Sequence, residues 1–203
     1  MTPVKLGLFG GSFDPIHFGH ILPIREARQA LGLERVIYLP TARPPHKTRR
    51  CLAPAHVRYA MVEMALLDEE GLYASPHELT LDRPAYTVET LEHFHAAMPA
   101  ADLHLIIGGD SFADLAKWVR WRDIVALARI VVLTRPGWDL DRVPLAEELS
   151  AAAHTERFVF LRQPPVDVSS TRLRELFQRD EPVPPGTMPG LVVRFVQKYG
   201  LYR

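Results

Sequence analysis

The stretch Gly11-Ser12-Phe13-Asp14-Pro15-Ile16-His17-Phe18-Gly19-His20 decides the fold, because it joins a short apolar run to the start of a helix. The run before it, residues 4–9, leads into Gly10-Gly11, as expected of a buried strand that ends in a tight turn. Residues 19–31 after it carry apolar side chains at helical spacing, with charged and polar residues between them. The sequence therefore opens with a predicted strand, a glycine turn and a helix.

The two histidines of this stretch indicate a phosphate site. Helix N-termini leave backbone N–H groups unpaired and carry partial positive charge, so a bound oligophosphate is stabilised there. His17 and His20 lie on one face of the first turn, and Gly19 between them lets the backbone come close to a ligand. A lone histidine at a helix start more often caps the helix or faces solvent. Two histidines that flank a glycine favour the phosphate site.

The length and charge of the chain restrict its partners. Its 203 residues, 47% of them hydrophobic, suit one α/β domain over residues 1–203. Lys plus Arg and Asp plus Glu both number 24, and this zero net charge argues against general binding to nucleic acid or to an anionic membrane. Basic groups at residues 46–50 and at Arg172 and Arg174 suit small phosphorylated ligands, although Arg49 and Arg50 fit a solvated loop equally well.

Cysteine use and hydropathy predict the compartment. Cys51 is the only cysteine, so no intrachain disulfide and no zinc knuckle can form, which fits a reducing environment. The first apolar stretch is too short for a secretion signal, and no run approaches the roughly 20 apolar residues that span a bilayer. We therefore expect a cytoplasmic protein without a membrane partner.

Strand-like runs alternate with helical stretches along the chain. This alternation predicts a Rossmann-like α/β fold, a doubly wound parallel sheet with helices on both faces. Strands are expected at residues 6–9, 36–39, 103–107, 130–133 and 158–161, with a weaker pair near Tyr73 and at 77–81. Helices are expected at residues 19–31, 55–67, 88–97, 111–116, 145–152, 171–178 and 190–199.

Ligands of open α/β sheets bind where the carboxyl ends of the strands open into a crevice. The candidate motifs of this chain all follow a predicted strand or an extended run: Gly10-Gly11, residues 40–47, 108–110 and 134–137, and Ser169-Ser170. The first strand is not followed by the G-x-G-x-x-G pattern of redox dinucleotide-binding folds. A bound nucleotide is therefore expected to be a substrate rather than a hydride carrier.

The decisive stretch resembles the (H/T)xGH signature of the adenylyltransferase and cytidylyltransferase superfamily, whose members transfer a nucleotide from a triphosphate to a phosphate acceptor. Residues 168–174, VSSTRLR, resemble the second motif of that superfamily, usually ISSTxIR. The resemblance implies catalytic roles for His17, His20 and Arg174, and ATP contacts at Gly10, Gly11, Ser12, Phe13, Gly108, Asp110, Ser169, Ser170 and Thr171. Asp110 could instead be a helix cap, and residues 169–171 are expected to cap a helix whether or not they contact a phosphate, so the ATP contacts at these positions stay open.

Nearly the whole chain resembles the bacterial nicotinate-nucleotide adenylyltransferases. Residues 40–47 resemble the PxxxPPHK loop of that family, residues 83–87 its RxSYT stretch, residues 108–111 its GxDS turn, and Trp118 its aromatic residue after that turn. The ending, residues 200–203, is also similar. The resemblance implies adenylyl transfer from ATP to nicotinate mononucleotide, which yields deamido-NAD and pyrophosphate in NAD biosynthesis.

The same resemblance implies a site for the acceptor. Trp118 would stack on the pyridine ring, and the backbone amides of Thr87 and Val119 would receive its carboxylate. Lys47 and Arg135, on loops that follow strands, would hold the phosphate of the mononucleotide. The remaining residues assigned to this site are Thr41 and His46.

Alternatives and departures stay open at this acceptor site. Trp118 and Trp121 could instead form one apolar helix face, and Arg135 could be an exposed turn residue. Many members of the family carry asparagine where Thr41 stands and serine where Ala85 stands. Both positions lie near the expected pyridine pocket, so polar contacts there do not carry over directly.

The expected reaction needs no activated side chain, because the acceptor phosphate is already an anion at neutral pH. We expect no covalent enzyme intermediate, and Mg²⁺ carried by the ATP phosphates, because no carboxylate cluster offers a metal cage. Two kinds of alternative stay open: a sister adenylyltransferase acting on nicotinamide mononucleotide or phosphopantetheine, and a nucleotide-binding sensor without turnover. The sequence leaves the oligomeric state open, a homo-oligomer included.

Overall fold

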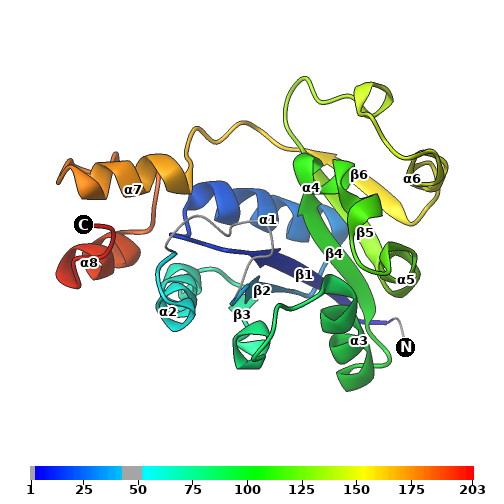
Figure 1. Ribbon diagram of the computed structural model, residues 1–203, viewed down its shortest axis with the longest axis horizontal. Coiled ribbons are helices and arrows are strands. Elements are labelled where there is room, and N and C mark those ends of the chain that lie inside the picture. Colours follow the sequence, from blue (N-terminus) through cyan, green and yellow to red (C-terminus); the bar gives the residue numbers. More distant parts are fainter. Residues whose placement is uncertain (1–2, 43–51) are drawn as a thin grey trace. The chain divides into compact units, whose positions relative to one another are not determined.

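A computed structural model describes residues 3–42 and 52–203 of the chain (Figure 1). Six strands form one sheet in the order β3-β2-β1-β4-β5-β6, in which the pairs β1·β4, β4·β5 and β5·β6 are parallel. This is the strand order of Rossmann-like folds, so the predicted α/β class, one parallel sheet flanked by helices, is confirmed. The strands are β1 (Lys5–Gly11), β2 (Arg35–Pro40), β3 (Leu72–Ala74), β4 (Asp102–Gly108), β5 (Arg129–Thr134) and β6 (Phe158–Arg162).

Helices separate most of these strands along the chain. The α-helices are α1 (Phe18–Leu31), α2 (Ala55–Leu66), α3 (Thr87–Ala97), α4 (Gly109–Ala113), α5 (Trp121–Leu127), α6 (Glu147–Ala153), α7 (Ser170–Gln178) and α8 (Gly190–Lys198). The short 3₁₀ helices are η1 (His77–Thr80), η2 (Leu115–Lys117) and η3 (Leu140–Arg142). Within residues 3–42 and 52–203, no helix combines the length and the apolar character needed to cross a bilayer.

Continuous burial explains why the apolar runs form strands. Residues 103–107 of β4 are all buried, as expected of a strand covered on both faces. Leu6 and Leu8 of β1 pair in register with Leu103 and Leu105, and all four are at most 5% exposed. The helical stripe expected after β1 is also buried, at Ile21, Ile24 and Ala27.

Three local predictions were wrong or incomplete. Residues 77–81 do not form a strand but contain η1, in which the hydroxyl of Thr80 donates to the carbonyl of His77 (2.8 Å) and closes the turn. The helix expected at 111–116 begins at Gly109, ends at Ala113 and is followed by η2. Helix α5 was not predicted, because its seven residues bury only Ile124 and therefore give little periodic signal.

The chain divides into two compact units. The described residues of Met1–Phe9, Ala27–Val36 and Ala85–Pro165 form the first unit. Those of Gly10–Glu26, Ile37–Pro84 and Val166–Arg203 form the second unit. The division places the described residues among the predicted site residues in two sets, one in each unit. That residues 1–203 form one domain stays a prediction.

Candidate active site

The two motif histidines lie at the start of α1 in the second unit. His17 immediately precedes the helix, and the backbone N–H of His20 donates to the carbonyl of His17 (2.8 Å). Their imidazole rings stack with centroids 3.8 Å apart. The ring of Phe13, buried with a φ of 45°, meets His20 edge-on at 5.3 Å between centroids. The structure therefore brings both histidines together, as their spacing predicts.

Burial decides the charge of His17. The residue is only 5% exposed, and its Nδ1 is buried with no hydrogen-bond partner among the described residues. Loss of hydration disfavours the charged ring, so burial lowers the pKa of His17 to about 4. At neutral pH, His17 is therefore a neutral imidazole, with one N–H donor and one acceptor nitrogen.

Gly19 allows a close approach between the two motifs. A Cβ at this position would lie 2.9 Å from the His17 ring and 3.1 Å from Cγ1 of Val168. The first turn of α1 is also tied down by Phe18, whose N–H donates to the carbonyl of Thr187 (3.0 Å). The structure thus places the start of α1 against the segment that leads into α7, although the two motifs are far apart in the sequence.

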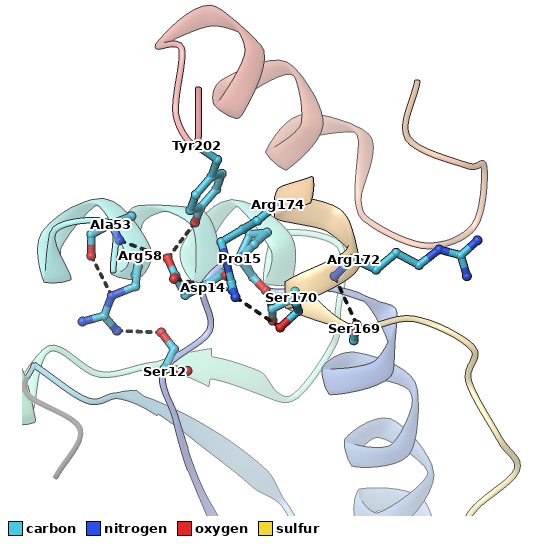
Figure 2. A network of polar contacts seen from close by, with 11 residues as sticks. Ser12, Asp14, Pro15, Ala53, Arg58, Ser169, Ser170, Arg172, Arg174 and Tyr202 are labelled. Carbon is cyan, nitrogen blue, oxygen red and sulfur yellow. Dashed lines mark hydrogen bonds and ion pairs between the residues drawn. The ribbon is translucent and has the colours of Figure 1, made fainter. Parts of the chain in front are cut away.

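The hydroxyls of the second motif contact the protein itself (Figure 2). Ser169 is the N-cap of α7, and its Oγ accepts from the backbone N–H of Arg172 (3.2 Å), so the expected capping role is confirmed. Ser170 Oγ donates to the carbonyl of Pro15 (3.0 Å). Thr171 Oγ1 accepts from Nη2 of Arg174 (3.2 Å). The bond from Ser170 fastens the start of α7 to the loop between β1 and α1, and the other two lie within the second motif.

A buried carboxylate that the sequence analysis did not single out lies in the same loop. Oδ1 of Asp14 accepts from the hydroxyl of Tyr202 (2.9 Å) and from the backbone N–H of Ala53 (3.1 Å). Its Oδ2 is 3.6 Å from Nη1 of Arg174, which also donates to the backbone carbonyl of Asp14 (2.5 Å). Burial, and next the negative charge of Asp14, raise the pKa of Tyr202, so the phenol stays a protonated donor.

Arg58 of α2 is a second residue that the motifs did not reveal. It is 1% exposed, and its guanidinium donates to the carbonyls of Ser12 (2.6 Å), Thr41 (2.8 Å) and Ala53 (2.9 Å). Burial lowers the pKa of Arg58 and the charge of Asp14 opposes this shift, so the guanidinium stays charged. Arg58 therefore ties the loops after β1 and β2 together.

The remaining ATP-site candidates of the second unit lie at the end of β1 and just after it. Gly10 and Gly11 are the last residues of β1, and Ser12 and Phe13 follow. Thr41, assigned to the acceptor, follows β2 and its N–H donates to the carbonyl of Gly11 (2.9 Å). His46 and Lys47 lie outside the described residues.

In the first unit, Gly108 and Asp110 lie where β4 meets α4. Gly108 is the N-cap residue of α4 and Asp110 belongs to the first turn. The alternative that Asp110 caps this helix was therefore wrong. A Cβ at Gly109 would lie 2.7 Å from Nε1 of Trp138, whose ring stacks on Phe160 at 5.5 Å between centroids. Glycine is therefore needed at position 109 for this close contact.

Three acceptor-site candidates of the first unit lie near helix starts. Thr87 is the first residue of α3. Trp118 and Val119 lie in the segment between η2 and α5, where Trp118 is extended and Arg120 has a left-handed φ of 52°. Trp121 begins α5, so Trp118 and Trp121 do not share a helix face, and that alternative was wrong.

Arg135 follows β5 and is exposed in a turn, where its carbonyl accepts from the N–H of Trp138 (3.1 Å). The exposed position agrees with the alternative that Arg135 is a turn residue. Among residues 3–42 and 52–203, no group of three or more His, Cys, Asp or Glu side chains is placed to hold a metal ion.

Comparisons with known proteins show the family to which the chain belongs. The profile of the cytidylyltransferase-like family matches residues 8–176, which include both motifs. Over 203 residues the chain is 38% identical to a Roseiflexus sp. protein named "Probable nicotinate-nucleotide adenylyltransferase", and the match covers 100% of both chains. It is 35% identical over 199 residues to a protein of the same name from Clostridium tetani, covering 98% of this chain and 99% of that one. The chain therefore belongs to the nicotinate-nucleotide adenylyltransferases of the cytidylyltransferase-like family.

A solved structure supports the fold. It is described as "Plasmodium falciparum nicotinic acid mononucleotide adenylyltransferase complexed with NaAD" and superposes with a TM-score of 0.75 at 15% identity. The match covers 98% of this chain and 97% of that one. At this low identity, the likeness concerns the fold.

Proposed function

We propose that the protein transfers the adenylyl group of ATP to nicotinate mononucleotide, which yields deamido-NAD and pyrophosphate. The observation that carries this proposal is the stacked pair His17 and His20, held against the α7 motif with Arg174 in a chain whose full-length relatives bear the name of this activity. Two imidazoles and a guanidinium in one unit suit the polyanionic tail of a nucleoside triphosphate.

The reaction is an in-line displacement at phosphorus. A phosphate oxygen of the mononucleotide forms a bond to the α-phosphorus of ATP, and the bond from that phosphorus to the pyrophosphate oxygen breaks. Negative charge grows on the leaving pyrophosphate. His17, His20 and Arg174 would stabilise that charge by hydrogen bonds and ion pairing, without a covalent enzyme intermediate.

Magnesium would arrive with the nucleotide. The buried carboxylate nearest the motif histidines in sequence, Asp14, has its Oδ1 occupied by Tyr202 and Ala53 and its Oδ2 turned to Arg174. With its oxygens engaged in this way, Asp14 is a poor ligand for Mg²⁺, which fits an ion held by phosphate oxygens and water rather than by protein carboxylates. When bound, Mg²⁺ neutralises charge on the phosphates.

For the acceptor, we assign the pyridine ring to Trp118 and its carboxylate to the backbone amides of Thr87 and Val119. Lys47 and Arg135 would hold the mononucleotide phosphate. The extended backbone at Trp118 and the exposed turn at Arg135 support this assignment, because both leave the side chain outside a regular helix.

A pyrophosphate-release assay tests the function. The purified protein is incubated with Mg-ATP and one acceptor: nicotinate mononucleotide, nicotinamide mononucleotide or phosphopantetheine. We expect turnover with nicotinate mononucleotide, and a product with the mass of deamido-NAD. Faster turnover with another acceptor would replace the proposal by a sister activity, and ATP binding without pyrophosphate release from any acceptor would favour a sensor.

We also expect the cytoplasm as the compartment, because the single cysteine of the chain fits a reducing environment. We expect no nucleic-acid partner, in line with the zero net charge.

A further inference from the structure

The carboxylate of Asp14 is held so that its two oxygens have different partners (Figure 2). Oδ1 accepts two hydrogen bonds, from Tyr202 and from the backbone of Ala53. Oδ2 is buried without a hydrogen bond in the described part of the chain and faces Nη1 of Arg174 at 3.6 Å. The bonds to Oδ1 therefore fix the plane of the carboxylate and direct its other oxygen at the guanidinium.

Arg174 makes three polar contacts, two with Asp14 and one with Thr171. Besides Oδ2, Asp14 offers its backbone carbonyl to Nη1 (2.5 Å), and Thr171 Oγ1 accepts from Nη2 (3.2 Å). The side chain of Arg174 is still 16% exposed. A guanidinium has five N–H donors, more than these contacts use, so it can bind a phosphate without leaving them.

The charge of this cluster suits an anionic ligand. Among residues 3–42 and 52–203, two buried or nearly buried guanidiniums, Arg58 and Arg174, face the carboxylate of Asp14, which leaves an excess of positive charge in this cluster. A guanidinium that is already oriented stabilises growing negative charge without the cost of reorganisation. Asp14 thus fixes Arg174 but does not cancel the charge of the cluster.

We propose that Asp14 is a positioning residue that orients Arg174 toward the ATP phosphates, and that Tyr202, near the end of the chain, orients Asp14 for this task. The inference rests on the proposed function, because Arg174 acts there on the triphosphate. Asp14 and Tyr202 act through Arg174 and need not touch a substrate.

Tyr202→Phe is the mildest test of this chain of contacts. It removes only the hydroxyl and keeps the ring, which stacks on Phe177 with centroids 6.1 Å apart and planes inclined by 26°. Tyr199→Phe is the matched control, since Tyr199 is 61% exposed at the end of α8. We expect kcat of Tyr202→Phe to fall about tenfold, as for one hydrogen bond to a charged group, and Tyr199→Phe to match the wild type.

A double-mutant cycle separates positioning from a structural role. Asp14→Asn keeps the shape and removes the charge, and we expect it to lower kcat at least about tenfold with KM for nicotinate mononucleotide nearly unchanged. In an Arg174→Ala background, the same Asp14→Asn change should lower kcat less than about twofold further. If the two losses multiply instead, Asp14 does not act through Arg174 and the inference is overturned.

A spectroscopic readout keeps the inference separate from the proposed function. In ¹⁵N NMR spectra, the Nη signals of Arg174 should show slow rotation of the guanidinium in the wild type and fast rotation in Asp14→Asn. If the wild type released no pyrophosphate, the proposed function would fail, and these signals would still decide the inference. Unchanged rotation would overturn it. Should Asp14→Asn fail to fold, Tyr202→Phe replaces it in both the cycle and the spectra.

Discussion

The imidazole rings of His17 and His20 stack with their centroids 3.8 Å apart and their planes inclined by 28°. Two imidazolium cations would repel each other at this separation, so the stack favours at least one neutral ring. His17 is neutral near pH 7, because burial lowers the pKa of His17 to about 4. The pair therefore meets a ligand with His17 as a neutral donor or acceptor.

Protonation of His17 should destabilise the fold. The pKa of His17 is about 4 in the folded chain against 6.5 for a free histidine, so between these values the unfolded state binds more protons. The free energy of unfolding then falls as the pH is lowered from 6.5 to 4. Above pH 6.5 His17 adds no pH dependence, and below pH 4 the loss is complete, at about 3 kcal/mol.

Urea unfolding of the wild type and of His17→Gln at pH 7, 6 and 5 measures this effect. The free energy of unfolding of the wild type should fall by about 2 kcal/mol more than that of the variant between pH 7 and pH 5. Burial also lowers the pKa of His104, but His104 is common to both proteins and cancels in the difference. If the free energy of unfolding of the two proteins changed in parallel with pH, His17 would not be the group whose protonation destabilises the fold.

Replacement of His20 should remove catalysis without unfolding the protein. If His20 stabilises charge on the phosphates, His20→Ala lowers kcat at least about 100-fold, equivalent to about 2.7 kcal/mol. His95→Ala, at an exposed position of α3, is the control. Steady-state kinetics with circular dichroism of each variant make the comparison, and a change in kcat below about threefold would refute the role of His20.

Gly19→Ala tests the contact between the two motifs. Alanine favours a helix more than glycine does, so helix propensity alone predicts a more stable protein. The added Cβ would instead lie 2.9 Å from the His17 ring, so we expect that ring to shift and kcat to fall about tenfold. Gly190→Ala in the first turn of α8 is the control, because, its chain neighbours and own helix backbone apart, no atom of the described residues lies within 4 Å of its Cβ position. A fully active Gly19→Ala protein would show that the close approach is not needed.

The apolar runs predict the sheet because burial on both faces leaves a continuous signal, as at residues 103–107. The start of α1 and the start of α7 are also predictable, since their histidines, serines and glycine follow local rules of helix starts. Short elements are not: η1 depends on one bond between Thr80 and His77, and α5 buries a single residue.

The contacts that organise the site are the part that sequence patterns miss. Asp14 and Tyr202 are 188 positions apart, and no local pattern joins them. Arg58 did leave a signal, because it shares helical spacing with the buried Met61, Val62 and Ala65 and must therefore face the core. An arginine on an apolar helix face indicates a buried charge with partners elsewhere in the chain.

Trp118→Ala should separate the two substrates. Trp118 lies in an extended segment and Trp121 in α5, where Arg122 covers its ring at 5.0 Å, so Trp121→Ala is a matched control. If Trp118 stacks on the pyridine ring, its loss should weaken binding of nicotinate mononucleotide at least about tenfold and that of ATP less than about twofold. Calorimetry of each substrate tests this, and an equal loss for both would contradict the stacking role.

Arg58→Lys should be among the most destabilising single changes in the second unit. One ammonium cannot reach the carbonyls of Ser12, Thr41 and Ala53 together, so buried acceptors lose their partners. We expect a loss of about 3 kcal/mol in the free energy of unfolding, measured in urea, whereas Arg179→Lys at an exposed position should change it by less than about 0.5 kcal/mol. A loss below about 1 kcal/mol for Arg58→Lys would mean that the loops after β1 and β2 hold their positions without this guanidinium.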